Sequence, residues 1–313
     1  MIPISLQRYR LGSFLACLLA SGWFPPPTLL AEDVPRLTIA THRFGGVQLM
    51  SIGIDGSNPQ QLTNDPDDAT QATWCPDGSK VAYVVGPRLQ GKIKIMDADG
   101  KNARVLLKDA APQRTPQWSP DGKQIAFSMV DKSNGNFNIF VVNTDGTGLK
   151  NLTDAPRFSA DPAWSPDGKK IAYASDRPGA RIRLWLMNAD GSEQTDVLGR
   201  DLYHAVYPAW SVDGKQIVYG SSVDPSQCQV MQVNFDGKGD SPITTGPNQY
   251  SYPAWSADGQ YLAYVSDPGA EAGDLCIYDV VAGKHRVVLK GEVFQELFRD
   301  ARPSWVPKQP PKQ

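Results

Sequence analysis

Histidine and aspartate side chains at matching places in the sequence could bind a cation. His42, Asp131, Asp176 and Asp267 each follow a short apolar segment, and His42, Asp176 and Asp267 fall in one register of a repeated pattern. Imidazole and carboxylate groups are common ligands of divalent metals. The register therefore allows a cation site at the rim of an axial opening. In the alternative, Asp176 and Asp267 accept hydrogen bonds from the backbone of their own loops, as Ser-Asp pairs at strand ends do.

Motifs of the common catalytic classes do not occur in the sequence. There is no HExxH, no CxxC, no GxSxG and no Walker-type glycine loop, which argues against the corresponding enzymes. We therefore predict no cofactor and favour a protein that is not an enzyme. The competing interpretation is a lyase, lactonase or hydrolase, or a binder of small ligands or glycans, that uses the axial opening. For an enzyme of this kind, His204 would join the four rim residues as a candidate.

Arginine and aromatic residues gather in the segments that connect the repeated units. Side chains of these types are enriched at protein interfaces. The set predicts a protein or peptide partner, whereas the alternative is ordinary packing of loops. Its members are Arg157, Phe158, Tyr203, His204, Tyr250, Tyr252, Phe298, Arg299 and Arg302.

These residues must be positioned by a repeat whose clearest copy is Pro-Ala-Trp-Ser-Pro-Asp-Gly at residues 162–168. Its tryptophans are Trp74, Trp118, Trp164, Trp210 and Trp255, at intervals of 44, 46, 46 and 45 residues. Asp and Gly follow each Trp at the third and fourth positions, and an aromatic residue follows at the ninth. A period of about 45 residues with strands on both sides of an Asp-Gly turn is typical of a β-propeller blade. The repeated Trp is expected to pack one blade on the next.

The ends of the chain decide how the ring closes. Each full unit contains a second turn, such as Asp190-Gly191, and therefore four strands. Residues 37–63 supply three strands without a Trp strand, and Arg302 to Trp305 supply a lone Trp strand. We therefore predict an all-β fold, a six-bladed β-propeller of four-stranded blades in which the N- and C-terminal strands complete one composite blade. Closure of this kind removes open sheet edges.

The first 31 residues do not follow the repeat. Arg8 and Arg10 precede the apolar run 11–20, which is too short to span a bilayer and is typical of a signal peptide. We predict a signal peptide at 1–31, the propeller at 32–306 and a disordered tail at 307–313. The chain is then expected to be a soluble, exported monomer without a membrane span.

The charge of the chain bears on its binding partners, and its cysteine content bears on disulfide bonds. The net charge of −2 and the pI of about 5.9 do not fit a nucleic-acid surface. Cys75, Cys228 and Cys276 remain after removal of the signal. Buried structural thiols are the default expectation, with a bridge between Cys228 and Cys276 as the alternative.

The repeat resembles the WD40-like (PD40) repeat of the TolB family. The resemblance rests on Pro162 to Gly168, on Ile171-Ala172-Tyr173, on Ser175-Asp176-Arg177 and on Leu-Thr strand ends such as Leu152-Thr153. It implies a six-bladed propeller in the bacterial periplasm. In that family the propeller of TolB binds the lipoprotein Pal, and an N-terminal α/β domain precedes it. Here the first strand is expected soon after Ala31, with no such domain. The resemblance favours a non-enzymatic interaction scaffold for an envelope protein or peptide, with a Pal-like lipoprotein as the candidate partner.

Overall fold

The computed structural model describes residues 34–87, 90–154, 157–177, 179, 181–199, 204–224, 227–267, 272–294 and 302–308. Residues from Pro35 onward form one compact unit, and the fold below is that of this unit. The predicted signal peptide, most of the tail, Tyr203, Phe298 and Arg299 lie outside the described residues. Among the described residues no helix is long and apolar enough to cross a membrane.

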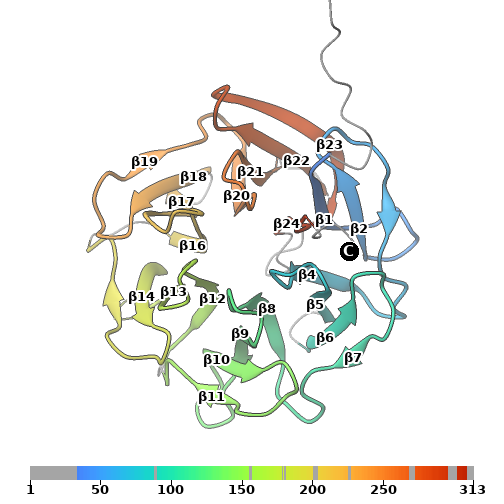
Figure 1. The fold of residues 1–313 in the computed structure, drawn as a ribbon. Helices are drawn as coiled ribbons and strands as arrows, with labels where there is room; N and C mark the ends of the chain where they lie inside the picture. The colour runs from blue at the N-terminus through green and yellow to red at the C-terminus, as the bar shows by residue number, and fades with distance from the viewer. Residues whose placement is uncertain are drawn as a thin grey trace, which may run out of the picture. The chain divides into compact units, whose positions relative to one another are not determined.

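Four antiparallel sheets of four strands make up most of the ring (Figure 1). The first contains β4 (Ala69–Trp74), β5 (Lys80–Val85), β6 (Lys92–Asp97) and β7 (Arg104–Val105). The second contains β8 (Gln113–Trp118), β9 (Gln124–Val130), β10 (Phe137–Asn143) and β11 (Lys150–Asn151). The third contains β12 (Ser159–Trp164), β13 (Lys170–Ser175), β14 (Arg183–Asn188) and β15 (Thr195–Asp196). The fourth contains β16 (His204–Trp210), β17 (Gln216–Asp224), β18 (Gln227–Asn234) and β19 (Ser241–Pro242).

A fifth sheet of eight strands closes the ring. One half is β20 (Gln249–Trp255), β21 (Tyr261–Asp267), β22 (Ala272–Asp279) and β23 (Lys284–Phe294). The other half, the composite blade, is β24 (Ser304–Trp305), β1 (Arg36–Thr41), β2 (Gln48–Gly53) and β3 (Gln60–Gln61). The halves meet where Thr41 pairs with Val293. The hydrogen bonds thus join the strands of the two halves into one sheet.

Pairing of the two chain ends confirms the predicted closure. In the composite blade, β24 pairs with β1 through Leu37 with Trp305 and Thr38 with Ser304. The Trp-bearing strands, β24 included, lie nearest the centre, and the short strands β7, β11 and β19 lie at the circumference (Figure 1). Because the strands are antiparallel, the Trp ends and their turns lie on one face, which we call the turn face. The opposite ends form the loop face.

Hydrogen bonds explain the Ser-Pro-Asp-Gly motif. Ser165 Oγ donates to Asp167 Oδ1 at 2.7 Å and accepts from the backbone N–H of Lys170 at 2.9 Å. Asp167 Oδ1 also accepts from the N–H of Lys169 at 3.1 Å. Gly168 completes the turn with a φ of +70°, which favours glycine. The same arrangement forms at Ser119, Ser211 and Ser256.

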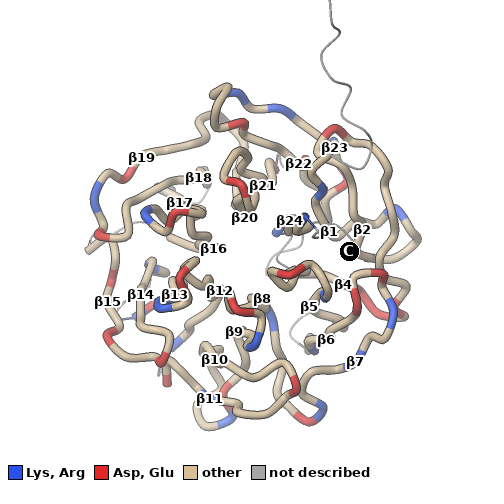
Figure 2. Tube along the Cα trace, in the orientation of Figure 1, with Lys and Arg blue, Asp and Glu red and all other residues tan. Residues whose placement is uncertain are grey.

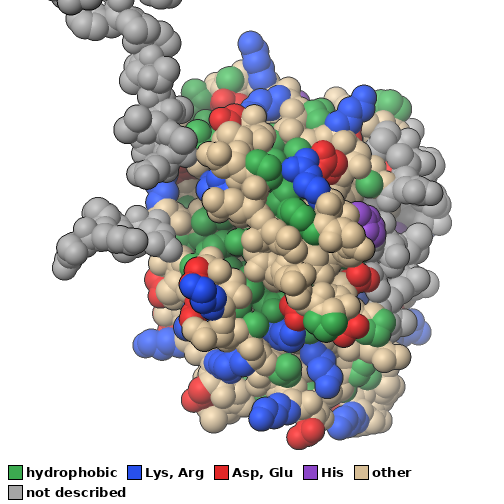
Figure 3. Space-filling model, turned by 90° about the vertical axis from the view of Figure 1, so that its right-hand side faces the viewer, with side chains coloured by type: hydrophobic (Ala, Val, Ile, Leu, Met, Phe, Trp, Pro, Cys, Tyr) green, Lys and Arg blue, Asp and Glu red, His purple; other side chains and the backbone are tan. Residues whose placement is uncertain are grey.

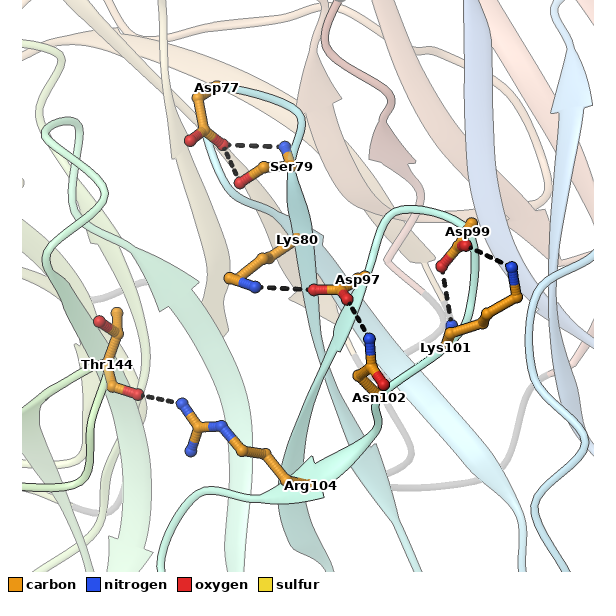
Figure 4. A network of polar contacts seen from close by, with 9 residues as sticks. All are labelled: Asp77, Ser79, Lys80, Asp97, Asp99, Lys101, Asn102, Arg104 and Thr144. Carbon is orange, nitrogen blue, oxygen red and sulfur yellow. Dashed lines mark hydrogen bonds and ion pairs between the residues drawn. The ribbon is translucent and has the colours of Figure 1, made fainter.

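The second turns carry the contacts between neighbouring sheets. Gly191 has a φ of +92°, and a Cβ there would lie 2.8 Å from the carbonyl oxygen of Leu152 in the preceding sheet. At Gly100 the corresponding distance to the Leu62 carbonyl oxygen is 2.6 Å. Figure 4 shows the polar network around one such turn, where Arg104 reaches the Thr144 carbonyl of the next sheet at 2.6 Å. Glycine is therefore required both for the turn and for the close approach of two sheets.

Aromatic residues of the second strand fill the space between sheets. Tyr83, Phe127, Tyr173 and Tyr219 are fully buried, and Tyr264 is 3 % exposed. Burial of an aromatic side chain stabilises the fold by about 1.5–3 kcal/mol. The tyrosine hydroxyls are satisfied within the blades, as where Tyr219 donates to Asp240 at 2.7 Å.

Charged side chains are spread around the molecule. Lys and Arg alternate with Asp and Glu along the ring in Figure 2. The side view in Figure 3 likewise shows both signs of charge interspersed with apolar side chains. This distribution agrees with the small net charge of −2.

Candidate functional site

A β-bulge interrupts the inner strands β4, β8, β12, β16 and β20 three residues before the Trp of each. In β4 the register shifts between Thr70 and Thr73, and Gln71 between them has a φ of 55°. A non-glycine residue with positive φ is uncommon and signals a position that the surrounding structure holds in place. The residue types here differ from blade to blade although the geometry repeats. With Arg302, which stands three residues before Trp305, these positions form what we call the axial ring: Gln71, Thr115, Asp161, Tyr207, Tyr252 and Arg302.

Part of the axial ring encloses a small chamber on the loop-face side of the Trp residues. The chamber has a volume of about 70 Å³ and is lined by Gln71, Arg114, Thr115, Phe158, Asp161, Ile182, Val206 and Tyr207. Gln71 Oε1 accepts from the N–H of Thr115 at 2.7 Å, which links two neighbouring inner strands. The hydroxyls of Thr115 and Ser128 are 2.7 Å apart. These bonds hold the polar wall of the chamber in a fixed arrangement.

Arg114 stands over two aromatic rings beside this chamber. Its guanidinium carbon lies 4.3 Å from the ring centre of Phe137 and 5.1 Å from that of Phe158. Its Nε is buried and has no hydrogen-bond partner. Stacking of this kind fixes the planar guanidinium and leaves its donors available to an incoming carboxylate or carbonyl. The sequence analysis did not single out Arg114, although the other copies carry a smaller residue at that place.

Tyrosines and an arginine continue the aromatic surface along the axis. The rings of Tyr207 and Tyr252 are 4.3 Å apart between centres. Arg302 lies over the Tyr207 ring at 5.9 Å. Arg302 and Tyr252 are 8 % exposed, so this group belongs to the interior of the channel.

The proposed partner-binding residues are divided between several places. Phe158 lines the chamber, and Arg157 donates to the carbonyl of Gly179 at 3.4 Å. His204, Tyr250 and Tyr252 were expected in loops but lie in β16 and β20. The inner strands begin earlier than predicted because the bulge adds residues on the loop-face side. The structure does not describe Tyr203, Phe298 or Arg299.

Two of the strand residues are held by packing. The ring of Tyr250 lies 6.0 Å from that of Tyr264. Burial, together with the positive charge of Arg181, lowers the pKa of His204.

The proposed axial rim is not assembled as a metal site. In the part of the chain that the structure describes, no three His, Cys, Asp or Glu side chains could hold a metal ion together. His42 is exposed and lies beside Arg43, Gly291 and Glu292. Asp131 Oδ1 accepts from the N–H and hydroxyl of Ser133 at 2.8 and 2.7 Å.

The surroundings of the three rim aspartates differ. Bonds from Ser133 lower the pKa of Asp131. Asp176 Oδ1 is buried without a hydrogen-bond partner. Asp267 is half-buried at the end of β21. Only Asp131 is thus shown to be engaged by its own loop.

A larger cavity opens on the turn face. It has a volume of about 370 Å³, and its walls come from the Trp residues of the inner strands and from the prolines on one or both sides of each Trp. We call it the Trp–Pro funnel. Its tryptophans are Trp74, Trp118, Trp164, Trp210, Trp255 and Trp305. Indole N–H groups tie neighbouring sheets together, since Trp118 donates to the Thr73 carbonyl and Trp210 to the Ala163 carbonyl, both at 3.1 Å. The tryptophans therefore pack the blades as predicted and also line the funnel.

Two of the three cysteines agree with the default expectation, because Cys75 and Cys276 are buried, whereas Cys228 is half-buried. Cys75, Cys228 and Cys276 are all free thiols, so the proposed bridge between Cys228 and Cys276 is absent. Cys75 occupies the place of the turn serine. Burial, with Asp77 nearby, raises its pKa to about 11.

The fold and its axial cavities define a β-propeller protein whose sheets close around a narrow channel. Residues 79–310 match the family model of the TolB beta propeller domain (PD40), and the chain belongs to this family. No curated protein sequence matches the chain.

Solved structures agree with this assignment. TolB from Acinetobacter baumannii is similar with a TM-score of 0.70 and 21 % identity, covering 88 % of this chain and 67 % of the other. A TolB-type structure from Agrobacterium tumefaciens has a TM-score of 0.68 and 20 % identity, covering 87 % of this chain and 97 % of the other. An oligogalacturonate lyase in complex with manganese has a TM-score of 0.61 and 17 % identity, covering 87 % and 78 %. At these identities the structures share the fold alone.

Proposed function

We propose that the protein is a non-enzymatic scaffold of the bacterial periplasm that binds a segment of an envelope protein or peptide on its loop face. The observation that supports this proposal is the cluster of Arg114, Phe137 and Phe158 at the mouth of the axial chamber. Arginine and large aromatic residues supply most of the binding energy in protein interfaces. Here they are already ordered by stacking, so binding costs less conformational entropy.

A rigid ring can present a preformed binding surface to a segment of a partner protein. The chamber combines a cation, amide and hydroxyl groups and aromatic rings within a few residues of the axis. A partner side chain could enter between Arg114 and Tyr207, while the surrounding loops contact the rest of the segment. The loops at this face come from several blades, which gives a broad surface on a fixed support.

Membership in the TolB family supports the finer part of the proposal. The partner would be a Pal-like lipoprotein, and residues 1–31 would direct export and be removed. The mature ring would span residues 32–306 and act as a monomer, with residues 307–313 as a disordered tail. The remaining candidates on this face, Tyr203, Phe298 and Arg299, would contribute to the same surface.

Affinity capture from an envelope extract tests the proposal. The tagged protein should retain an envelope protein in stoichiometric amount. Arg114→Ala should weaken retention about tenfold or more, as expected for a hot-spot residue. Arg114→Lys should also weaken it, because an ammonium cannot reproduce the stacked planar fork.

The matched control is Lys123→Ala on the turn face, where the lysine side chain is 81 % exposed. Retention should be unchanged in this variant. Equal capture by wild type and by both Arg114 variants would refute the loop-face proposal. If no protein is recovered and a metal is tightly bound, the result would support the alternative, an enzyme that uses the axial opening.

A further inference from the structure

The last strand before the composite blade is much longer than its counterparts. β23 has 11 residues, whereas β3, β7, β11, β15 and β19 have two each. Its pairing with β22 begins directly at the hairpin turn, with Asp279 opposite Lys284, and continues to Ala272 opposite Phe294. In Figure 1 β23 runs along the circumference of the ring. The molecule therefore presents one long strand at its outside.

Part of the outer edge of β23 has no partner among the described strands. β1 reaches that edge at a single pair near the far end of β23. A Cβ on Gly56, in the second turn of the composite blade, would lie 3.7 Å from the Val288 carbonyl oxygen, so that turn limits the free stretch. Residues 284–287 pair with β22 alone. An edge of this kind presents N–H and C=O groups to which a further strand can bind.

Exposed valines gather at the same hairpin. Six large apolar side chains are exposed among the described residues, and three of them are Val280, Val281 and Val287, at 39, 88 and 55 %. Val280 and Val281 lie in the turn that leads into β23, and Val287 lies in the free stretch. Burial of such side chains against a partner is favourable. The valines therefore supply apolar contacts beside an open strand edge.

The charges of the free stretch favour an acidic partner. Lys284 and Arg286 are exposed, and Arg286 donates to the Ile54 carbonyl at 2.5 Å, which holds it in place. Asp279, opposite Lys284, accepts from the N–H of Ala282 at 2.8 Å. If two copies paired through this edge, the cations of one strand would lie next to those of the other, and like charges across strands are destabilising. The edge thus disfavours a second copy and favours a strand with carboxylates.

We propose that residues 280–287, which we call the hairpin edge, bind an extended acidic segment of a partner protein as an additional strand on β23. The segment places carboxylates near Lys284 and Arg286 and apolar side chains near Val281 and Val287. Main-chain hydrogen bonds hold the segment, and the side chains select it. None of the described lining residues of the loop-face chamber belongs to the hairpin edge. The interaction is therefore additional to the one proposed above.

Binding of a short peptide to the whole protein tests the proposal. The probe is acetyl-Thr-Glu-Val-Glu-Val-Glu-Thr-amide, and its control carries Lys in place of each Glu. Titration calorimetry should show that the acidic peptide binds about tenfold or more tightly than the basic one. Hydrogen exchange at residues 284–287 should become slower when the acidic peptide is bound.

Methylation of the peptide backbone distinguishes strand addition from a simple attraction between charges. One version of the acidic peptide carries N-methyl groups on its odd residues, and the other carries them on its even residues. Alternate N–H groups of a strand point to the same edge. One version should therefore lose binding, and the other should keep it. Equal affinities of the two versions would overturn strand addition.

A charge reversal locates the site. Lys284→Glu should weaken binding of the acidic peptide about five- to tenfold, because an attraction becomes a repulsion. Lys123→Glu is the matched control, since it makes the same change of charge at a lysine that is 81 % exposed in the β8–β9 turn. Its affinity should equal that of the wild type.

Three results would overturn the proposal. The first is no binding of the acidic peptide at millimolar concentration, or equal binding of the acidic and basic peptides. The second is an equal effect of Lys284→Glu and Lys123→Glu. The third is a dimer in sedimentation experiments that protects residues 284–287 without peptide, which would assign the hairpin edge to a second copy of the chain.

Discussion

Single residues at equivalent positions show which parts of the repeat are structural. Serine accepts and donates a hydrogen bond in four of the first turns, whereas the first copy carries Cys75. At the axial ring the residue types vary while the bulge is kept. Repetition therefore marks side chains that build the blade, and variation marks those that are free to serve binding.

Cys75→Ser should leave the protein as stable as wild type or slightly more stable. The serine hydroxyl would repeat the bonds that Ser165 makes with Asp167 and Lys170. Cys276→Ser should instead lower the free energy of unfolding by about 1–3 kcal/mol, because it replaces a buried sulfur by a smaller and more strongly hydrated hydroxyl, although the Tyr264 hydroxyl stays within reach. Urea unfolding of both variants measures the difference. A larger loss in Cys75→Ser than in Cys276→Ser would contradict the account of the turn.

Stability should decline as pH falls below about 6.5, the ordinary pKa of histidine. Burial lowers the pKa values of His204 and His285 in the folded protein. The unfolded chain then binds protons more readily, so acid favours unfolding. His285 is held by the Tyr264 hydroxyl at 3.0 Å and by stacking on Tyr278 at 4.6 Å.

Melting temperatures at pH 7.5 and 5.5 provide the measurement. His285→Gln should reduce the difference between the two values, because the variant has lost one of the two titrating groups. The turn aspartates have lowered pKa values, so their protonation affects stability only below this pH range. An equal or larger difference in the variant would show that His285 does not contribute.

At the scale of secondary-structure elements, the second turns of the repeat join neighbouring sheets. Backbone carbonyl groups of one sheet lie against the turn glycines of the next, and long cations cross the same boundary. Lys150 donates to the Asp190 carbonyl at 2.8 Å in the same way that Arg104 reaches Thr144. The boundary between sheets is thus made of polar backbone contacts at the outside and aromatic packing inside.

Gly191→Ala should destabilise the protein more than Gly168→Ala. Both glycines have positive φ, so the conformational strain of alanine is similar. Only Gly191 would bring a Cβ to 2.8 Å from a backbone oxygen, whereas Gly168 has its nearest neighbour at 3.8 Å. We expect the difference to reach about 1–3 kcal/mol in denaturant unfolding. Equal losses would mean that the turn can move away from the Leu152 carbonyl.

On the scale of the whole molecule, closure depends on a short strand. β24 contributes only two paired residues to β1, and the indole of Trp305 donates to the Ala254 carbonyl at 2.8 Å. A single pair, Thr41 with Val293, joins β23 to the same edge of β1, because the opposite edge is paired with β2. These few contacts hold the two ends of the chain together.

Removal of residues 302–313 should lower the stability of the entire ring. Without β24 the composite blade loses its inner strand, and the edge of β1 is left open. Removal of 309–313 alone is the matched control and should have little effect. Thermal unfolding by circular dichroism compares the two truncated proteins. An unchanged melting temperature after the longer truncation would show that closure does not support the other blades.

Much of the fold could be predicted because it repeats. The Trp spacing and the Asp-Gly turns locate strands to within a few residues, and the incomplete units at the two ends predict the composite blade. The start of the inner strands could not be predicted. The bulge places Gln71 and Thr115 at positive φ, and their residue types do not mark such a conformation.

The candidate site was only partly predictable. Phe158 and Arg302 belonged to the expected set. Arg114 did not, because Phe137, one of its two stacking partners, lies 23 residues along the chain. The axial ring could have been recognised in the sequence. The residue three places before the Trp varies between copies, whereas the rest of the repeat is regular.

The glycine contact between neighbouring sheets has a geometric consequence. If each contact fixes the rotation from one repeat to the next, the curvature of the ring is encoded locally, in every repeat separately. The sum of these rotations must then reach a full circle at one particular copy number. Duplication of a repeat would therefore produce an open spiral or a strained circle, and variation between relatives is expected in the loops while the number of repeats stays constant.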